Sequence, residues 1–116
     1  MLLMIKGKSV QLKREKDDGI RICIMRFVRR YYDYDILMQE LAPSIELLTE
    51  YKKGKMNWEE YEKRYLDEIK DKDAAIQKII GLGKDKNVTL LCWEFDDKFC
   101  HRRLVINEIN KRYASS

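Results

Sequence analysis

The sequence predicts a small three-layer α/β sandwich, in which helices flank a short, mostly parallel sheet in a Rossmann-like arrangement. Two apolar runs, Ile20–Met25 and Asn87–Trp93, have the composition of buried strands. The segment between them has helical periodicity, and a long helical crossover requires parallel pairing with a right-handed connection. A chain of 116 residues fits one domain. We therefore expect residues 1–116 to form a single α/β domain.

The first third of the chain is expected to supply two strands. Met1–Ile5 is apolar and could form an opening strand, whereas Lys6–Asp18 is polar and basic. The dipeptide Asp18-Gly19 is a turn signal before the β-branched strand Ile20–Met25. A cluster of arginines and tyrosines follows this strand at residues 26–34.

Helices are expected next. The apolar residues of Ile36–Leu41 predict a short helix that ends before Pro43. Ser44 is suited to N-cap a second helix over Ile45–Lys53, and Gly54 is suited to end it.

Two longer helices follow in the middle of the chain. Asn57, with Glu60 three residues later, resembles a capping box. Asp73 is suited to cap another helix, which Gly83 would end. The helix after Asn57 has one apolar face, which is formed by Trp58, Tyr61, Tyr65 and Ile69.

The last part of the chain is expected to contain the central strand and a final helix. Asn87–Trp93 is nearly all apolar, as a strand covered on both faces should be. A polar loop follows, and the final helix is expected from near Cys100 to about Tyr113.

Charge is unevenly distributed along the chain. The net charge is +4 and 38% of residues are charged, well above the roughly 25% of typical soluble domains. Residues 1–32 carry a net charge of +6, residues 33–75 carry −5, and residues 76–116 carry +3. If the two ends of the chain lie side by side, one face could attract an anion. The alternative is a solvated surface rich in ion pairs, a composition that also suits a thermophile.

Cysteine usage and the apolar runs favour a cytoplasmic protein. Three cysteines is an odd number, which does not suggest a secreted disulfide framework. The longest uninterrupted apolar stretch, Met1–Ile5, is too short for a membrane span or a signal sequence. We therefore expect reduced thiols and no association with a membrane.

Residues that can do chemistry collect after the two central strands. Ligands of open parallel sheets bind beyond the carboxyl ends of the strands. If the two strands are neighbours, their ends form one crevice, and the functional prediction depends on this placement. The residues that would converge there are Arg26, Cys92, Glu94, Cys100, His101 and Arg102.

The start of the last helix is suited to an anion, because it presents unpaired N–H groups and a partial positive charge. Arg26 and Arg102 would add planar donors that can grip an anion with two parallel bonds. The Cys100 thiol should have a lowered pKa in this position. His101, the only histidine, could act as a general acid or base, and Glu94 could orient it or move a proton.

Each of these residues has a structural alternative. Cys23 and Cys92 could be small core residues, and Cys100 could be either a reactive thiol or a packing residue. His101 could cap the helix or pair with an acidic residue of the preceding loop, and Arg102 could bridge to that loop. Trp58 and the tyrosines at helical spacing could be core residues.

Cys92, Cys100 and His101 also raise the alternatives of a metal site and a redox pair. Cys92, Cys100 and His101 supply three soft ligands, but their spacing lacks the close Cys-x-x-Cys pairs of structural zinc sites. We therefore predict neither a metal nor another cofactor. A redox pair between Cys92 and Cys100 stays an alternative, since the loop between them could bring them close.

Four groups of residues together resemble a known family over nearly the whole chain. The first is Asp18-Gly19-Ile20-Arg21 with Arg26, and the second is Glu40-Leu41-Ala42-Pro43-Ser44. The third is Trp58, Tyr61, Arg64-Tyr65 and Glu68, and the fourth is Val88–Cys92, Glu94 and Cys100-His101-Arg102.

With these motifs the chain resembles domain of unknown function family 488. One departure is Phe27-Val28-Arg29-Arg30, where the family often has a Trp-Pro-Arg-Gly-like turn. The resemblance implies no established activity. It implies the α/β fold and a site at Arg26, Ser44, Tyr65, Cys92, Glu94, Cys100, His101 and Arg102.

Three functions are compatible with these observations. The favoured one is binding of a small phosphate- or nucleotide-like anion at the carboxyl ends of the strands, and catalysis is left open. In it, Cys100, His101, Glu94 and Cys92 are the catalytic candidates, and Arg26, Arg102, Ser44 and Tyr65 the ligand-binding candidates. The second is a nucleic-acid-binding module that uses the basic N-terminal third. The third is a structural or partner-binding role, with a homodimer that extends the sheet through Met1–Ile5.

Overall fold

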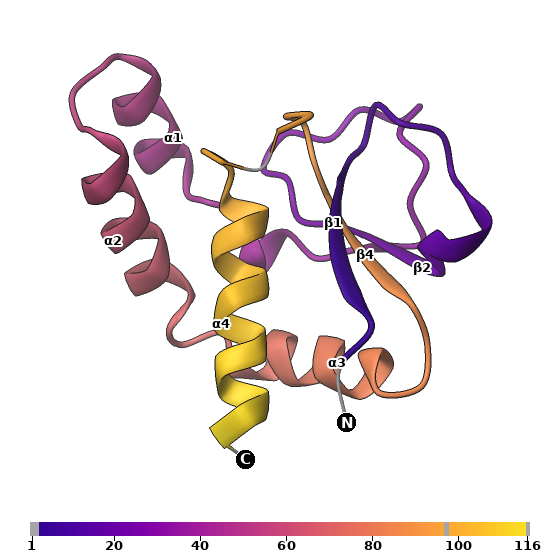
Figure 1. Cartoon of the computed structure of the whole chain (residues 1–116). Helices are drawn as coiled ribbons and strands as arrows, with labels where there is room; N and C mark the ends of the chain where they lie inside the picture. The colour runs from indigo at the N-terminus through magenta and orange to yellow at the C-terminus, as the bar shows by residue number, and fades with distance from the viewer. Residues whose placement is uncertain (1–2, 97, 116) are drawn as a thin grey trace.

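A computed structural model describes residues 3–96 and 98–115 as a parallel sheet with helices packed around it (Figure 1). The strands are β1 (Ile5–Ser9), β2 (Ile20–Cys23), β3 (Ile36–Leu37) and β4 (Val88–Cys92). Their order is β1-β4-β2-β3, and every pairing is parallel. The predicted α/β class is thereby confirmed, and the arrangement is consistent with a small three-layer sandwich.

The strand β4 is the centre of the sheet. All five of its residues are buried, as its uninterrupted apolar composition predicts. It pairs with β1 on one side, where Ser9 lies opposite Cys92, and with β2 on the other, where Ile22 lies opposite Leu90. The carboxyl ends of β2 and β4 are therefore neighbours, as the sequence predicted.

Within the described residues, four α-helices begin close to the predicted positions. They are α1 (Ile45–Lys52), α2 (Trp58–Ile69), α3 (Asp73–Gly83) and α4 (His101–Ser115). Ser44 Oγ accepts the N–H of Leu47, and Asn57 Oδ1 accepts the N–H of Glu60, so both predicted N-caps are present. The residue before α3 is Lys72, and Asp73 is the first residue of the helix instead of its cap.

The helices bury their apolar faces against the sheet and against one another. Helix α4 packs on β1 and β4, α3 packs on β4, and α2 packs on α4. Figure 1 shows α1 and α2 side by side, with α4 between them and the sheet. Tyr61, Tyr65 and Ile69 of α2 are buried, which confirms three members of the predicted apolar face. No helix in the described residues is long and apolar enough to cross a membrane.

Two predicted elements were wrong. The first strand is Ile5–Ser9, not Met1–Ile5, of which residues 1 and 2 lie outside the described residues. Lys6 and Lys8 give this segment a polar composition, so its sequence does not indicate a strand. In the structure Lys8 is nevertheless buried and ion-paired. The predicted helix Ile36–Leu41 is instead β3 followed by a short 3-10 helix, Gln39–Leu41. Pairing of Ile36 with Ile22 extends the sheet here and overrides local helical preference.

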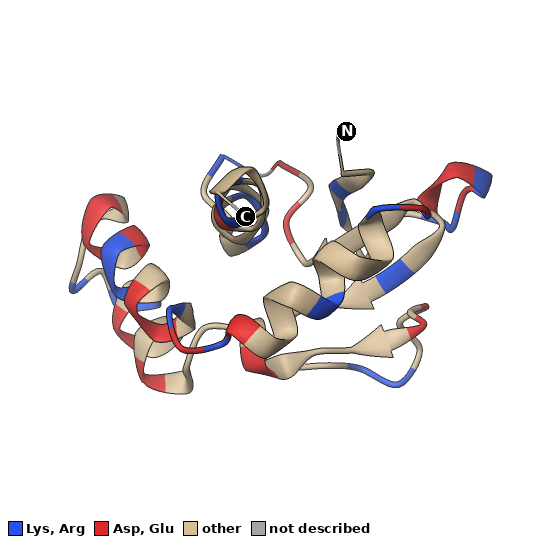
Figure 2. Cartoon of the chain, turned by 90° about the horizontal axis from the view of Figure 1, so that it is seen from below, with Lys and Arg blue, Asp and Glu red and all other residues tan. Residues whose placement is uncertain are grey.

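Four of the nine basic side chains in residues 1–32 are ion-paired with carboxylates: Lys6, Lys8, Arg14 and Arg21. The Asp18 carboxylate is fully buried, with Lys8 Nζ at 2.9 Å and Arg21 Nη1 at 2.7 Å from Oδ2. Figure 2 shows acidic and basic positions adjoining in the segment before β2. Further ion pairs join Lys6 to Asp17 and Arg14 to Asp33 and Asp35.

Candidate functional site

Two thiols meet at the carboxyl end of β4. Cys92 is the last residue of this strand, and Cys100 immediately precedes α4. Their Sγ atoms are 2.8 Å apart, and each residue is only 2% exposed. The end of the strand and the start of the helix therefore lie together.

His101 contacts both the thiol pair and the neighbouring strand. Its Nδ1 lies 3.3 Å from Cys92 Sγ, and its Nε2 lies 2.7 Å from the backbone oxygen of Ile24, just after β2. A carbonyl oxygen only accepts, so Nε2 carries a proton and donates it, which leaves Nδ1 facing the thiol. The ring also packs edge-on against Tyr65, with 5.4 Å between centroids. The imidazole is therefore held in one orientation.

Arg102 holds the loop between the two cysteines. It is 2% exposed, and its guanidinium donates to the backbone oxygens of Glu94 and Phe95. Its Nη1 also lies 3.7 Å from Cys100 Sγ. Gly7 of β1 leaves room for this side chain, because a Cβ there would lie 2.9 Å from Arg102 Cδ. The arginine therefore links the start of α4, the loop and the thiol.

The surroundings favour a thiolate at Cys100 and a thiol at Cys92. The hydrogen bond with Cys92 lowers the pKa of Cys100 well below its usual value. Burial opposes this effect, while His101 and the backbone N–H of Arg102 add to it. Burial, with the adjacent Cys100, raises the pKa of Cys92 well above its usual value. The pair is thus a thiol that donates to a thiolate.

Titration of the thiols should detect this thiolate. We expect one equivalent of thiolate absorbance in the reduced protein at neutral pH, with a midpoint below the usual thiol pKa of about 8.5. Cys92→Ala removes the donor, so the midpoint should rise. Cys23→Ala is the control and should leave the neutral-pH thiolate unchanged, because burial raises the pKa of Cys23. A wild-type midpoint at or above the usual value would contradict the assignment.

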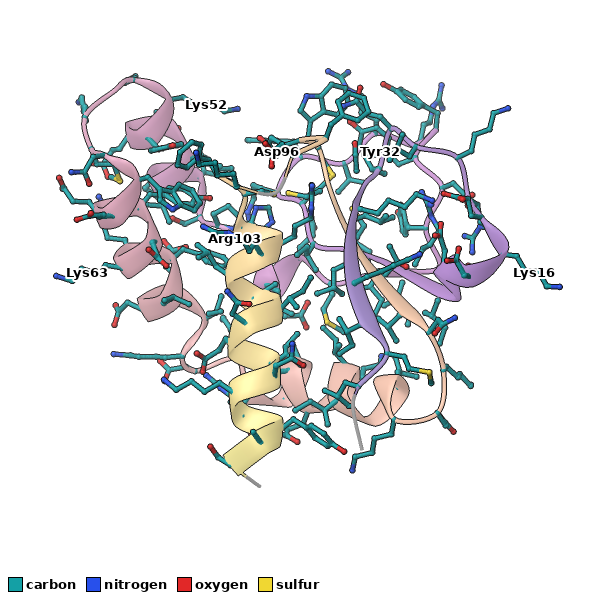
Figure 3. The ribbon with its side chains drawn as sticks, in the orientation of Figure 1. Lys16, Tyr32, Lys52, Lys63, Asp96 and Arg103 are labelled. Carbon is teal, nitrogen blue, oxygen red and sulfur yellow. The ribbon has the colours of Figure 1, made fainter. Side chains whose placement is uncertain are left out.

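The thiol pair forms part of the wall of a cavity of about 580 Å³. This volume is within the range of small-molecule sites. Glu94, His101 and Arg26 line the same cavity, and so do two further cations, Arg29 and Lys52. Figure 3 shows Lys52 and Tyr32 on opposite sides of the loop that carries Asp96. The aromatic residues of the lining include Tyr31, Tyr32, Tyr51, Tyr61, Trp93 and Phe99.

The amino-acid pattern of most of the chain matches a protein family. A sequence model described as the active DUF488-N3 subclade matches residues 5–113. The chain belongs to this DUF488 subclade. The matched residues run from the start of β1 almost to the end of α4, so they contain every residue of the site. No curated protein and no solved structure matches the chain.

The other predicted site residues of this DUF488-N3 protein lie beside the cavity or away from it. Arg26 lines it, but its guanidinium donates to the backbone oxygens of Gln39, Ala42 and Pro43. Tyr65 is fully buried behind His101, and its hydroxyl donates to the backbone oxygen of Leu41. Ser44 caps α1, and its hydroxyl contacts Glu68. The roles of Arg26, Arg102, Ser44 and Tyr65 in ligand binding stay predictions.

Several members of the site could not be found in the sequence. The Ile24 carbonyl fixes His101, but a backbone group leaves no mark in a side-chain pattern. Lys52 lies within the predicted helix Ile45–Lys53 with no functional signal of its own, and it lines the cavity together with Leu48 and Tyr51 of α1. Trp93 and Phe99 are about half exposed. Their exposure beside charged groups becomes visible only in three dimensions.

The three soft ligands of this DUF488-N3 site do not have the spacing of a loaded zinc centre. Cys92, Cys100 and His101 offer ligand atoms that all lie within 4.8 Å of one another. Two thiolates on a tetrahedral zinc ion lie about 3.8 Å apart, given Zn–S bonds of about 2.3 Å. The observed separation of 2.8 Å is about 1 Å shorter than this spacing. We therefore assign no metal to these residues.

Proposed function

We propose that this DUF488-N3 protein binds a small phosphate- or nucleotide-like anion in the cavity at the carboxyl ends of β2 and β4. The observation that supports this most is the shared lining, in which Cys100 and His101 face the same space as Arg29 and Lys52. A cytoplasmic location, which is part of the proposal, would keep the thiols reduced.

Exposed aromatic rings suit the planar part of such a ligand. Tyr31 is 74% exposed and Trp93 is 47% exposed, although both line the cavity. Tyr32 packs between them, with ring centroids 5.1 Å from Tyr31 and 6.4 Å from Trp93. Stacking of a base on an aromatic side chain contributes about 1–3 kcal/mol. A nucleobase would therefore gain affinity here that inorganic phosphate would not.

The two cations suit the phosphate. The guanidinium of Arg29 can donate two parallel hydrogen bonds to phosphate oxygens, and Lys52 adds a point charge. A nucleophilic role for Cys100 belongs to the same proposal. Its sulfur would form a bond to an electrophilic atom of the ligand, and the leaving group would depart with the electron pair and take a proton from water.

The pairing of charge favours this function over a nucleic-acid module. Lys8, Arg14 and Arg21 are neutralised by carboxylates of the same chain. An extended phosphate backbone needs many available cations, whereas one phosphate group needs two or three. The basic N-terminal third therefore has fewer unpaired cations for a nucleic acid than its formal charge suggests.

Ligand-induced thermal stabilisation tests the proposal. Nucleoside monophosphates should raise the melting temperature of the reduced protein by several degrees at saturation, and more than inorganic phosphate does. Arg29→Ala removes a charged hydrogen-bond donor, which contributes about 1.5–3 kcal/mol, so Kd should rise about 10- to 100-fold. Lys52→Ala should also weaken binding.

Matched controls are available next to Arg29 in the chain and on α2, the helix that packs against α1. Arg30→Ala changes the neighbouring charge outside the cavity lining. Lys63 points away from the cavity in Figure 3, so Lys63→Ala controls for Lys52→Ala. Equal weakening by the controls, or no stabilisation by any nucleotide or phosphate, would refute this function.

A further inference from the structure

We infer a second activity for the site: Cys100 and Cys92 reduce a hydroperoxide and close to an intramolecular disulfide. This activity needs the two thiols and a small oxidant only. It does not depend on the proposed nucleotide-like ligand.

The separation of the sulfur atoms supports this inference. The Sγ atoms are 2.8 Å apart, and a disulfide bond is about 2.05 Å long. The sulfurs therefore need to approach by less than about 1 Å. The loop between them, residues 93–99, is exposed at most of its described positions and can accommodate this change.

The two thiols differ in the way that peroxide reduction requires. The attacking sulfur must be a thiolate, and the Cys100 sulfur has the Arg102 guanidinium 3.7 Å away and Cys92 as its partner. The second sulfur must be a protonated thiol that can be activated later, and Cys92 has His101 Nδ1 3.3 Å away as a proton acceptor.

Access also distinguishes the pair from the third cysteine. Cys92 and Cys100 both line the cavity, so a molecule as small as hydrogen peroxide can reach them. Cys23 is fully buried in the core at the end of β2. It therefore serves as an internal reference thiol.

The reaction balances in two steps. The Cys100 thiolate attacks one peroxide oxygen, the S–O bond forms, and the O–O bond breaks to release hydroxide, which becomes water by taking up the proton that Cys100 lost to solvent when it ionised. Cys92 then transfers its proton to His101 and attacks the Cys100 sulfur, so the S–S bond forms and the S–O bond breaks. The departing hydroxide takes the proton from His101 and leaves as water. In total the dithiol and one hydrogen peroxide give a disulfide and two waters.

Intact-mass spectrometry of the full chain tests this activity without any other ligand. The reduced protein, freed of reductant, is treated with one equivalent of hydrogen peroxide. We expect a loss of about 2 Da that dithiothreitol reverses, and peptide mapping should place the disulfide between Cys92 and Cys100. The Cys23→Ser variant should react in the same way.

Two further variants separate the steps. Cys92→Ser should stop at the sulfenic acid, with a gain of about 16 Da that a sulfenic-acid trap captures at Cys100. Cys100→Ser should react at least about tenfold more slowly than the native pair, since the attacking thiolate is absent. Peptide mapping of the peroxide-treated wild-type protein identifies the bonded cysteines even if a variant does not fold.

Three outcomes would overturn the inference. They are an unchanged mass, a disulfide that includes Cys23, and a bound zinc ion that blocks the reaction until a chelator removes it. Because nucleotide binding is measured on the reduced protein, failure of this inference leaves the proposed function intact, and the reverse also holds.

Discussion

Replacing Gly19 with Ala is expected to lower the free energy of unfolding by about 2–6 kcal/mol. Gly19 has φ of 63° and ψ of −128°, a backbone conformation that residues with a Cβ rarely adopt. A Cβ at this position would lie 2.1 Å from the backbone oxygen of Asn87. Backbone strain and steric overlap with Asn87 therefore both destabilise the Gly19→Ala variant.

The backbone around Gly19 has little freedom to relieve this overlap. The next residue, Ile20, donates its N–H to the same Asn87 oxygen at 2.9 Å, which begins the pairing of β2 with β4. Moving either backbone away would break this hydrogen bond and disturb the register that brings the two strand ends together.

Urea denaturation of the variant measures the effect: at an unchanged slope m, the shift of the midpoint gives the change in the free energy of unfolding. Gly81→Ala is the matched control, because Gly81 lies within α3 and a Cβ there would meet nothing within 4 Å. It should raise the free energy of unfolding by about 0.5–1 kcal/mol. Similar midpoints for the two variants would contradict this account.

Asp18→Asn is expected to lower the free energy of unfolding by about 3–5 kcal/mol. The carboxylate is fully buried between Lys8 and Arg21, which are 8% and 0% exposed. The amide keeps the shape but removes the negative charge, so two cations remain buried without their main partner. The exposed neighbour Asp17 forms only a surface ion pair, and Asp17→Asn should change stability by less than about 0.5 kcal/mol.

The same carboxylate gives the protein a specific acid response. Burial opposes ionisation, but hydrogen bonds from Lys8 and Arg21 hold the pKa of Asp18 well below its usual value. The group therefore stabilises the fold fully above the unfolded pKa of about 3.9, and this contribution is lost as pH falls below it. Denaturation midpoints between pH 3 and 6 should fall more steeply in the wild type than in Asp18→Asn. Parallel curves would contradict the role of Asp18.

The sequence was sufficient for the features that depend on local patterns. The apolar runs that form β2 and β4, and the capping residues Ser44 and Asn57, act through side chains close in the chain. The rule that ligands bind beyond the carboxyl ends of parallel strands placed Cys92 and Cys100 in one region, while their direct contact was left as an alternative that depended on the loop between them.

Features that depend on contacts between distant segments were not predictable. Two residues are too few for a strand signal, and β3 exists only because Ile22 is available to pair with Ile36. The lysines of β1 give this strand a polar composition that does not indicate a buried strand. The charge of Lys8 is balanced by Asp18, which lies ten residues later in the chain. The hydrogen bond from His101 to Ile24 crosses 77 positions of the chain.

Both edge strands of the sheet are poor templates for pairing with a further strand. One edge strand is β3, which has two residues, and the other is β1, which carries Lys6 and Lys8. Short strands and lysines discourage backbone pairing between molecules. A homodimer built through β1 would bring the exposed Lys6 of one copy toward the Lys6 of the other. The native chain should therefore stay dispersed at high concentration and resist the strand-by-strand growth that seeds fibrils.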